Sequence, residues 1–316
     1  MLRYTVRRLL GAIPLLLGVA MLSFIFMQIT PGGPDALFAR NGRMSPEQLA
    51  AIRHAMGLDQ PGYVQLLRWI GNLARGDLGM SYSQYRPVSQ VIWDVFPNTL
   101  LLMAAGLTIS LICSLTFGIL AARKQYGFFD NVTSFVSYFG LAMPVFWFGL
   151  MLQLLFAVRL GWLPSSGMYS TNGGDLPDLL RHLALPAFTI AIGSIAGWSR
   201  YIRSSTIEQF GLDYVRTARA KGLGERRVVT GHVLRNALVP FVTVVAIDTP
   251  LYLTGAVLVE TVFSWPGMGR LFYDSLTVRD YPVLMGALIL GAVLIVLGNL
   301  IADLLYGLLD PRISLS

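Results

Sequence analysis

The residue in the most unusual chemical setting is Asp248, a carboxylate within the apolar stretch from Leu238 to Val262 and two residues before Pro250. Charged side chains are costly in hydrocarbon, so those that occur there usually face a bundle interior or a water-filled path. Two interpretations of Asp248 stay open. It contacts the positive end of a molecule in such a path, or nearby hydroxyls or a partner subunit satisfy it.

A second group of functional residue types lies in the polar segment from Asp213 to Pro240. Small and charged residues alternate there, in the order Arg216, Thr217, Ala218, Arg219, Ala220, Lys221, Gly222, Leu223, with Glu225 close behind. We predict a short helix that ends at Gly222, because glycine adopts the left-handed conformation that caps helices, and a second short helix after it. Ala218 and Ala220 are small enough to let a partner surface approach closely. A loop that only set the topology would explain the arginines but not this ordered spacing.

Several patterns that would indicate an enzyme or a metalloprotein are missing from the sequence. It contains no Gly-x-x-x-x-Gly-Lys-Ser/Thr phosphate loop, so we expect this chain neither to bind nor to hydrolyse ATP. His54, His182 and His232 share no metal-ligand spacing. Cys113 is the one cysteine and excludes an internal disulfide. We therefore predict no catalytic residue, metal site or cofactor in this chain.

Membrane helices must position these residues. Of the 316 residues 54% are hydrophobic and 13% are charged, whereas soluble domains carry about 25% charged residues. A helical span needs about 20 mainly apolar residues. Six segments meet that need: Leu9–Thr30, Asn98–Ala122, Val132–Val158, Leu185–Tyr201, Leu238–Val262 and Val283–Leu309. The first is too long for a signal-peptide core of roughly 7–15 residues, so we expect a retained span.

Two of the spans carry special features. The third contains Pro144, where we predict a kink within one span. The fourth is the shortest, and we expect it to continue as helix past Arg200 and Arg203.

The distribution of positive charge predicts the orientation of the spans. With the N-terminus inside, one face collects more than half of the 24 Lys and Arg residues in short loops, whereas acidic residues balance the rest on the other face. Cytoplasmic loops carry such an excess, so both termini are predicted to be cytoplasmic. The net charge of +7 is then a topology signal, and nucleic acid is not expected as a partner.

We predict one membrane domain, 1–316, with an extracytoplasmic loop region at 31–97 and a cytoplasmic loop at 204–237. In the first of these, Ser45 is typical of a helix N-cap, because Pro46 follows at the first helical position. A second extracytoplasmic stretch, Gly161 to Pro186, joins the third and fourth spans.

The sequence resembles a known family at these positions. The Ala-x-x-x-Gly segment at Ala218–Gly222 and the downstream segment Leu234–Pro240 are similar to the cytoplasmic "EAA" loop of ABC importer permeases. Tyr214–Gly222 and His232–Pro240 resemble the dipeptide, oligopeptide and nickel branch. Further blocks agree, in order along nearly the whole chain: Leu58–Pro61, Gly76–Gly79, Arg86–Val88, Glu260–Gly269, Asp280–Pro282 and Asp310–Arg312.

Three positions depart from the family pattern. Arg216 stands where the broader family has glutamate, although arginine is usual in this branch. Gly33 stands where the branch usually has aspartate, and Asp248-Thr249-Pro250 is unusual for the branch.

The resemblance implies an all-α membrane protein with six transmembrane helices in the type I ABC importer permease fold, N-in and C-in. Such a chain is the transmembrane subunit of an ATP-driven importer in the inner (plasma) membrane of a prokaryote. Its loop would form a coupling helix on a separate ATPase subunit, and ATP and Mg²⁺ would bind to the ATPase subunits only.

The site residues follow from the resemblance and from the residue types. For the contact with the ATPase we name Arg216, Thr217, Ala218, Arg219, Ala220, Lys221, Gly222, Leu223 and Glu225. For the translocation path or gate we name Asp248, Pro250, Glu260, Trp265 and Pro144. Glu260, Trp265 and Arg270 lie at the outer end of span five, where the family places the gate and the docking surface. Trp265 is equally typical of an interfacial aromatic anchor, which we favour.

The partners implied are a second permease subunit, which we expect to be non-identical, two ATPase subunits, an extracytoplasmic substrate-binding protein and membrane lipid. Di- and oligopeptides are the first choice of substrate; oligosaccharides, nickel complexes and glutathione are alternatives within the branch. A stand-alone secondary transporter would show inverted repeats with paired broken helices, and a channel a charged ring. We find neither, and no nucleophile–base pair indicates a membrane enzyme.

Overall fold

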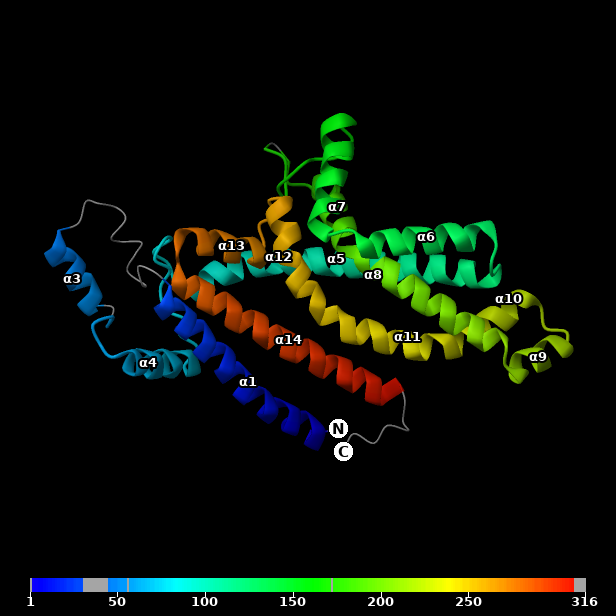
Figure 1. The fold of residues 1–316 in the computed structure, drawn as a ribbon, viewed down its shortest axis with the longest axis horizontal. Coiled ribbons are helices and arrows are strands. Elements are labelled where there is room, and N and C mark those ends of the chain that lie inside the picture. The colour runs from blue at the N-terminus through cyan, green and yellow to red at the C-terminus, as the bar shows by residue number, and fades with distance from the viewer. Residues whose placement is uncertain (1, 31–44, 56, 172, 310–316) are drawn as a thin grey trace. The chain divides into compact units, whose positions relative to one another are not determined.

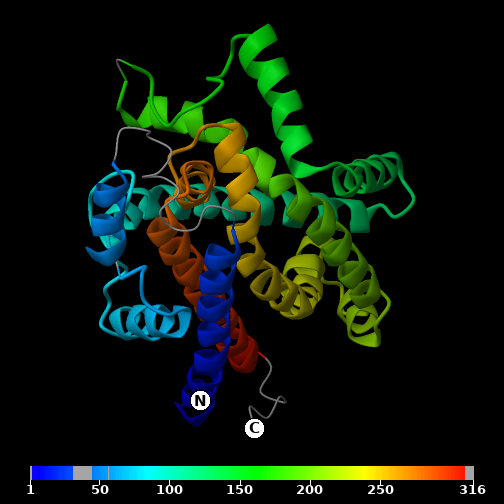
Figure 2. The same cartoon turned by 60° about the vertical axis from the view of Figure 1, so that its left-hand side comes forward.

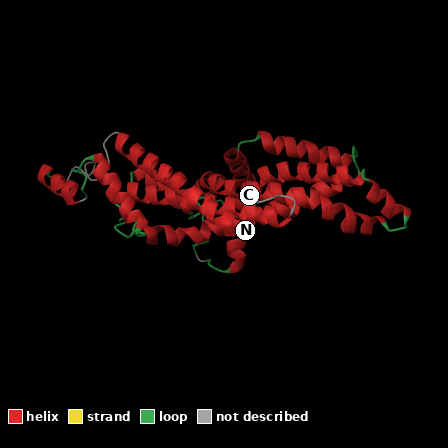
Figure 3. Cartoon of the chain, turned by 90° about the horizontal axis from the view of Figure 1, so that it is seen from below, coloured by secondary structure: helices red, strands yellow, loops and turns green. Residues whose placement is uncertain are grey.

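The computed structural model describes residues 2–30, 45–55, 57–171 and 173–309, and within them every regular element is a helix (Figure 3). Gly33 and the block Asp310–Arg312, on which part of the family resemblance rests, lie outside the described residues. The elements are α1 (Leu2–Ile29), α3 (Pro46–Ala55), α4 (Gly62–Ala74), α5 (Val88–Arg123), α6 (Phe128–Ala142), α7 (Val145–Leu152), the π-helical segment η1 (Gln153–Arg159), α8 (Leu176–Phe210), α9 (Asp213–Ala220), α10 (Glu225–Val228), the π-helical segment η2 (Val229–Val233), α11 (Leu234–Asp248), the 3₁₀ turn η3 (Thr249–Leu251), α12 (Tyr252–Val262), α13 (Met268–Val278) and α14 (Tyr281–Leu309) (Figure 1).

Five helical runs are long and apolar enough to cross a membrane, and a bent pair of helices brings the number to six. The five are Tyr4–Ile29, Val88–Arg123, Leu176–Phe210, Glu225–Asp248 and Tyr281–Leu304, and the bent pair is Phe128–Ala142 with Val145–Arg159. The predicted number of six spans is therefore confirmed when the bent pair is counted as one. The fifth run, however, is Glu225–Asp248 rather than the predicted Leu238–Val262, because the turn η3 separates it from α12.

The third span bends much more sharply than the kink that the sequence predicted. Its two halves meet at 110°, and both Met143 (ψ 132°) and Pro144 (ψ 131°) are extended between them. A proline has no backbone N–H and pushes the residue before it out of the helical region. The helix therefore stops at Ala142 and a new one starts at Val145.

The fourth span is also longer than predicted. Helix α8 begins at Leu176 rather than Leu185, because Asp175 caps its N-terminus by accepting a hydrogen bond from the backbone N–H of Asp178 at 3.0 Å. Pro186, the predicted end of the connecting stretch, lies inside this helix. The predicted continuation past Arg200 and Arg203 is confirmed, since α8 ends at Phe210.

The chain divides into two compact units. The first comprises Leu100–Trp265 with the end of α14, and the second comprises Leu2–Thr99 with Pro266–Val296. The single domain over 1–316 stays a prediction.

In the first unit α8 is the central helix. It contacts α6, α7, α11 and α12, and Figures 1 and 2 both show it running beside α11. Its contact with α5 is close: a Cβ added at Gly118 would lie 2.2 Å from Ile202 Cγ2 and 2.5 Å from the carbonyl oxygen of Ser199. Small residues allow such approach between helices in lipid, where packing replaces the hydrophobic effect.

In the second unit two apolar clusters bring together helices that are far apart in the sequence. Phe24 and Met27 of α1 pack with Tyr281, Leu284 and Met285 of α14. The start of α5 packs through Val88, Val91 and Ile92 on α13 and on Val283. The predicted N-cap is confirmed, because Ser45 Oγ accepts from the N–H of Gln48 at 3.2 Å while the Gln48 side chain accepts from the N–H of Ser45 at 2.9 Å.

Candidate functional site

The loop between α8 and α11 folds around a small core of its own. Val215 and Ala218 of α9 are buried against Val228 and Val233. Figure 1 shows α9 and α10 beyond the ends of α8 and α11. The loop is therefore an ordered helical hairpin rather than an extended basic tail.

An ion pair closes this hairpin. Arg219 donates to Glu225 through Nη2 at 2.7 Å and through Nε at 3.2 Å, and its guanidinium lies 5.5 Å from the centre of the Phe210 ring. The hydrogen bond to Glu225 raises the pKa of the Arg219 guanidinium. Exposed pairs contribute only ~0–1 kcal/mol, so we assign this two-point contact to fixing the geometry of α9 against α10.

The end of α9 has the predicted left-handed cap. Gly222 has φ +76°, and its N–H bonds to the carbonyl oxygen of Arg219 at 2.9 Å. A Cβ added at Gly222 would meet no atom within 4 Å. The glycine is therefore needed here for its backbone conformation and not for packing within this chain.

The predicted contact residues fall into two groups. Those exposed on the hairpin are Arg216, Thr217, Arg219, Ala220, Lys221, Gly222 and Glu225. Ala218 is 5% exposed and packs inside the hairpin, and Leu223 is half-buried beside the same core. Ala220, rather than Ala218, is thus the small residue that lies open for a close approach.

The second predicted site is a break in span five. Helix α11 ends at Asp248, the 3₁₀ turn η3 follows with Pro250, and α12 then continues to Val262. Pro250 cannot donate to the carbonyl of Ala246, four residues earlier, because it has no N–H. Pro250 packs against α14, since a Cβ added at Gly298 would lie 3.0 Å from Pro250 Cγ.

Asp248 contacts an aromatic cluster at this break. Trp198 of α8 donates from Nε1 to Asp248 Oδ2 at 2.8 Å. The Trp198 ring lies 6.2 Å from the rings of Phe241 and Tyr252, and the Tyr252 hydroxyl lies 2.6 Å from Ser110 Oγ. The sequence singled out Asp248 but not its partner Trp198.

The predicted gate residues at the outer end of span five are buried. Glu260 and Trp265 are each 0% exposed, and the Trp265 N–H donates to the Glu260 carbonyl oxygen at 2.8 Å. An interfacial anchor presents its ring to the headgroups, so the burial of Trp265 argues against the anchor interpretation. Pro144 lies at the bend between α6 and α7, and Arg270 is partly exposed on α13, 3.6 Å from Asp274.

Sequence reasoning missed an ion pair between α6 and α8. Asp130, which is 2% exposed, accepts hydrogen bonds from both Nε and Nη2 of Arg203, and it also accepts from the Tyr126 N–H at 2.8 Å. Arg200, one turn earlier, lies 4.4 Å from the centre of the Tyr138 ring. Opposite charges at neighbouring span ends were the available signal, but Arg203 was considered only for the length of the fourth span.

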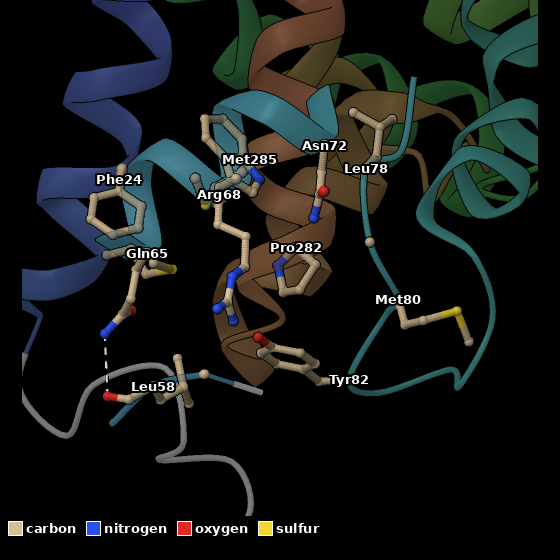
Figure 4. Close-up of a pocket in the computed structure, with 14 residues that line it drawn as sticks. Phe24, Leu58, Gln65, Arg68, Asn72, Leu78, Met80, Tyr82, Pro282 and Met285 are labelled. Carbon is tan, nitrogen blue, oxygen red and sulfur yellow. Dashed lines mark hydrogen bonds between the residues drawn. The ribbon is translucent and has the colours of Figure 1, made fainter. Parts of the chain in front are cut away.

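The second unit contains a pocket of about 280 Å³ that no sequence pattern indicated. Figure 4 shows Arg68 extending from α4 past Pro282 toward Tyr82, while Gln65 donates to the carbonyl of Leu58 at 3.2 Å. Burial, with the nearby Asp280 carboxylate, raises the pKa of Tyr82 to about 12. Four separate chain segments line this pocket, which is why the linear sequence did not reveal it.

Asp280 anchors the loop beside this pocket. It is 0% exposed, and its Oδ2 accepts from Ser81 Oγ (2.5 Å), Ser83 Oγ (2.6 Å) and the Ser83 N–H (3.0 Å). Its Oδ1 accepts from the Tyr82 N–H at 3.1 Å. Asp280 was noticed only as part of a family block.

Apolar helices with an ordered charged hairpin and a broken span define a multi-pass membrane protein of the transport-permease class. The comparison with known families makes this specific. Two models match consecutive parts of the chain: the N-terminal part of the binding-protein-dependent transport system membrane component over residues 1–103, and the binding-protein-dependent transport system inner membrane component over residues 114–315. The chain belongs to this family of ABC importer permeases, which are not enzymes.

Curated relatives match over the full length. The chain is 45% identical to the oligopeptide transport system permease protein AppB of Bacillus subtilis, covering 99% of this chain and 100% of that protein. It is 41% identical to the di/tripeptide transport system permease protein DppB of Pseudomonas aeruginosa, with 99% of each chain covered. It is 38% identical to the dipeptide transport system permease protein DppB of Escherichia coli K12, again with 99% of each covered.

Solved structures support the fold. An amino acid ABC transporter crystallised with histidines aligns with a TM-score of 0.50 at 16% identity, over 71% of this chain and 95% of that one. An inward-facing methionine ABC transporter aligns with the same TM-score and identity, over 71% of this chain and 96% of the other. The all-α type I permease fold expected from the sequence is thereby confirmed.

Proposed function

We propose that this chain is the transmembrane subunit of an ATP-driven importer of di- and oligopeptides in a prokaryotic inner membrane. The single observation that carries the substrate class is the full-length similarity to permeases named for oligopeptides, di/tripeptides and dipeptides. Oligosaccharides, nickel complexes and glutathione are the alternatives.

The partners in this proposal are a second, non-identical permease subunit, two ATPase subunits and an extracytoplasmic binding protein. ATP and Mg²⁺ bind to the ATPase subunits. The α9–α10 hairpin is the part of this chain that contacts an ATPase, and its exposed Arg216, Lys221 and Gly222 support that role. Closure of the ATPase pair then moves the hairpins together and switches the spans between inward-facing and outward-facing states.

The path residues in this proposal are those at the breaks and at the outer end of the spans. Asp248 and Pro250 lie at the break in span five, Pro144 lies at the bend in span three, and Glu260 and Trp265 form the buried outer end. Breaks in a membrane helix are tolerated where the backbone is buried in protein or lines a cavity, which supports placing these residues along the path.

Reconstitution tests the proposal directly. The chain is purified with the subunits that accompany it, placed in proteoliposomes with the binding protein, and assayed for ATP-dependent uptake of a radiolabelled tripeptide. Unlabelled oligosaccharide, nickel complex and glutathione serve as competitors. The proposal would be contradicted if just one of these three competitors blocked uptake of the tripeptide. It would also be contradicted if the chain purified without any ATPase subunit.

The orientation of the chain is testable in intact cells. In a Cys113→Ala background, single cysteines at Lys221 and Gln84 are treated with a membrane-impermeant maleimide on intact cells. We expect labelling at position 84 only, because the hairpin is proposed to be cytoplasmic. Labelling at position 221 only would show that the orientation is the opposite of the one proposed.

A further inference from the structure

The carboxylate of Asp248 is held from one side only. Trp198 Nε1 donates to Oδ2 at 2.8 Å, and within the described residues no donor reaches Oδ1. Trp198 is 2% exposed and packed between Phe241 and Tyr252, so its indole N–H has a fixed position. The carboxylate is therefore oriented by a rigid donor and keeps one oxygen available.

Asp248 also has no cationic partner. In the part of the chain that the structure describes, no Lys, Arg or His nitrogen forms an ion pair with it, whereas Asp130 pairs with Arg203 in the same unit. Asp248 is half-buried at the end of α11, where the turn η3 begins, and it lies near the middle of the predicted span Leu238–Val262. An acidic side chain at the centre of a membrane helix costs at least ~2.5 kcal/mol if it faces lipid, so its open side faces either a polar path or another subunit.

The surroundings of the carboxylate select the chemistry of a ligand. Beside the free Oδ1 lie the rings of Trp198 and Tyr252, which are 2% and 5% exposed and make the surroundings of the carboxylate largely apolar. A carboxylate with one free oxygen in such surroundings suits an organic ammonium group, which donates charge-assisted hydrogen bonds to that oxygen. An anionic or purely apolar group gains nothing from Oδ1.

We propose that Asp248 binds a primary ammonium group of the transported molecule, oriented by Trp198 at the break in span five. This inference rests on the proposed function, in which the cargo is a peptide. The ammonium comes from the free N-terminus of the peptide or from a lysine side chain, and both present the same chemistry to Oδ1. Asp248 thus contributes to selectivity within the membrane, independently of the binding protein.

The test measures binding to the purified permease–ATPase complex without the binding protein. Saturation-transfer NMR compares three peptides: tri-alanine, N-acetyl tri-alanine, and N-acetyl-Ala-Lys-Ala. We expect the wild-type complex to bind tri-alanine at least about tenfold more tightly than its acetylated form, and Asp248→Asn to abolish this difference. The third peptide shows whether a lysine ammonium replaces the N-terminal one.

Two further variants separate recognition from folding. Trp198→Phe keeps an aromatic side chain but removes the indole N–H that orients Oδ2, and we expect about a fivefold loss for tri-alanine only. Asp303→Asn removes a carboxylate from span α14 and should leave the ratio between the free and the acetylated peptide unchanged. Equal binding of the two peptides to the wild type, or an equal loss for both in Asp248→Asn, would overturn the site.

Uptake by the full system keeps this inference distinct from the proposed function. If the wild type takes up no peptide in proteoliposomes, the peptide function fails. If it takes up tri-alanine and Asp248→Asn does so at the same rate and affinity, the peptide function stands and only the ammonium site is refuted.

Discussion

The buried Asp280 should hold the loop at Ser81–Ser83 in place, and replacing it with asparagine tests this closely. The amide of asparagine has one acceptor oxygen. If that oxygen takes the place of Oδ2, it keeps the hydrogen bonds from Ser81 Oγ, Ser83 Oγ and the Ser83 N–H. The new NH₂ group then takes the place of Oδ1, which in the wild type accepts a hydrogen bond from the Tyr82 N–H. Three charge-assisted bonds then become neutral ones, and one backbone donor loses its acceptor.

The magnitude follows from typical hydrogen-bond energies. Bonds to charged groups contribute ~1.5–3 kcal/mol and neutral ones ~0.5–1.5 kcal/mol, so each converted bond loses about 1 kcal/mol. An unsatisfied buried N–H adds at least about 1 kcal/mol. The total is about 4 kcal/mol, which corresponds to a change of roughly 10³ in the local opening equilibrium.

Hydrogen–deuterium exchange of the purified complex is the suitable assay, because it reports on opening of one segment. We expect exchange of the Tyr82 and Ser83 amides to accelerate by about two to three orders of magnitude in Asp280→Asn, and to accelerate further in Asp280→Ala. Asp274→Asn, an exposed carboxylate on α13, serves as the control and should change nothing at this loop. Unchanged exchange at Tyr82 and Ser83 in Asp280→Asn would refute the reasoning.

Three further changes have defined outcomes. Gly118→Ala should lower the melting temperature of the complex, because the new Cβ would lie 2.5 Å from the Ser199 carbonyl oxygen and cause ~1–3 kcal/mol of strain. Gly193→Ala is the control and should not lower it, because a Cβ there meets nothing within 4 Å. Equal melting temperatures of the two variants would contradict the close approach at Gly118. Burial raises the pKa of Tyr82 to about 12, so the unfolded state releases the Tyr82 proton at a lower pH than the folded state does. The contribution of the Tyr82 hydroxyl to the free energy of unfolding is therefore complete below pH 10 and is lost as the pH rises to about 12. Tyr82→Phe should remove this alkaline loss in melting curves recorded from pH 9 to 12, and an unchanged alkaline slope would count against it. Gly222→Trp strains a left-handed residue by ~1–2 kcal/mol, but its Cβ meets no atom of this chain within 4 Å. Membrane insertion should therefore survive, while peptide-dependent ATP hydrolysis and uptake fail. Normal uptake by this variant would show that α9 does not contact the ATPase.

Much of the local structure was predictable from the sequence. Ser45 caps α3, Gly222 ends the hairpin helix with positive φ, and apolar runs of sufficient length became helices. These features depend on interactions within a few residues, such as a cap bonding to the next turn, or on mean hydropathy over a segment. Boundaries were less predictable: α8 starts earlier than expected because a cap at Asp175 decides where it begins.

Other features were decided only by the tertiary structure. Asp248 meets Trp198 across 50 residues, Arg203 meets Asp130 across 73, and Ser81 meets Asp280 across 199. The sequence identified Asp248 as out of place in a span, yet nothing near it in the sequence indicated which donor would orient it. Composition and short-range patterns therefore determined the class of protein, its spans and its hairpin. The partner of each buried charge depended on which helices pack together, because a hydrogen bond requires its two atoms to lie about 3 Å apart in space, whatever their separation in the sequence.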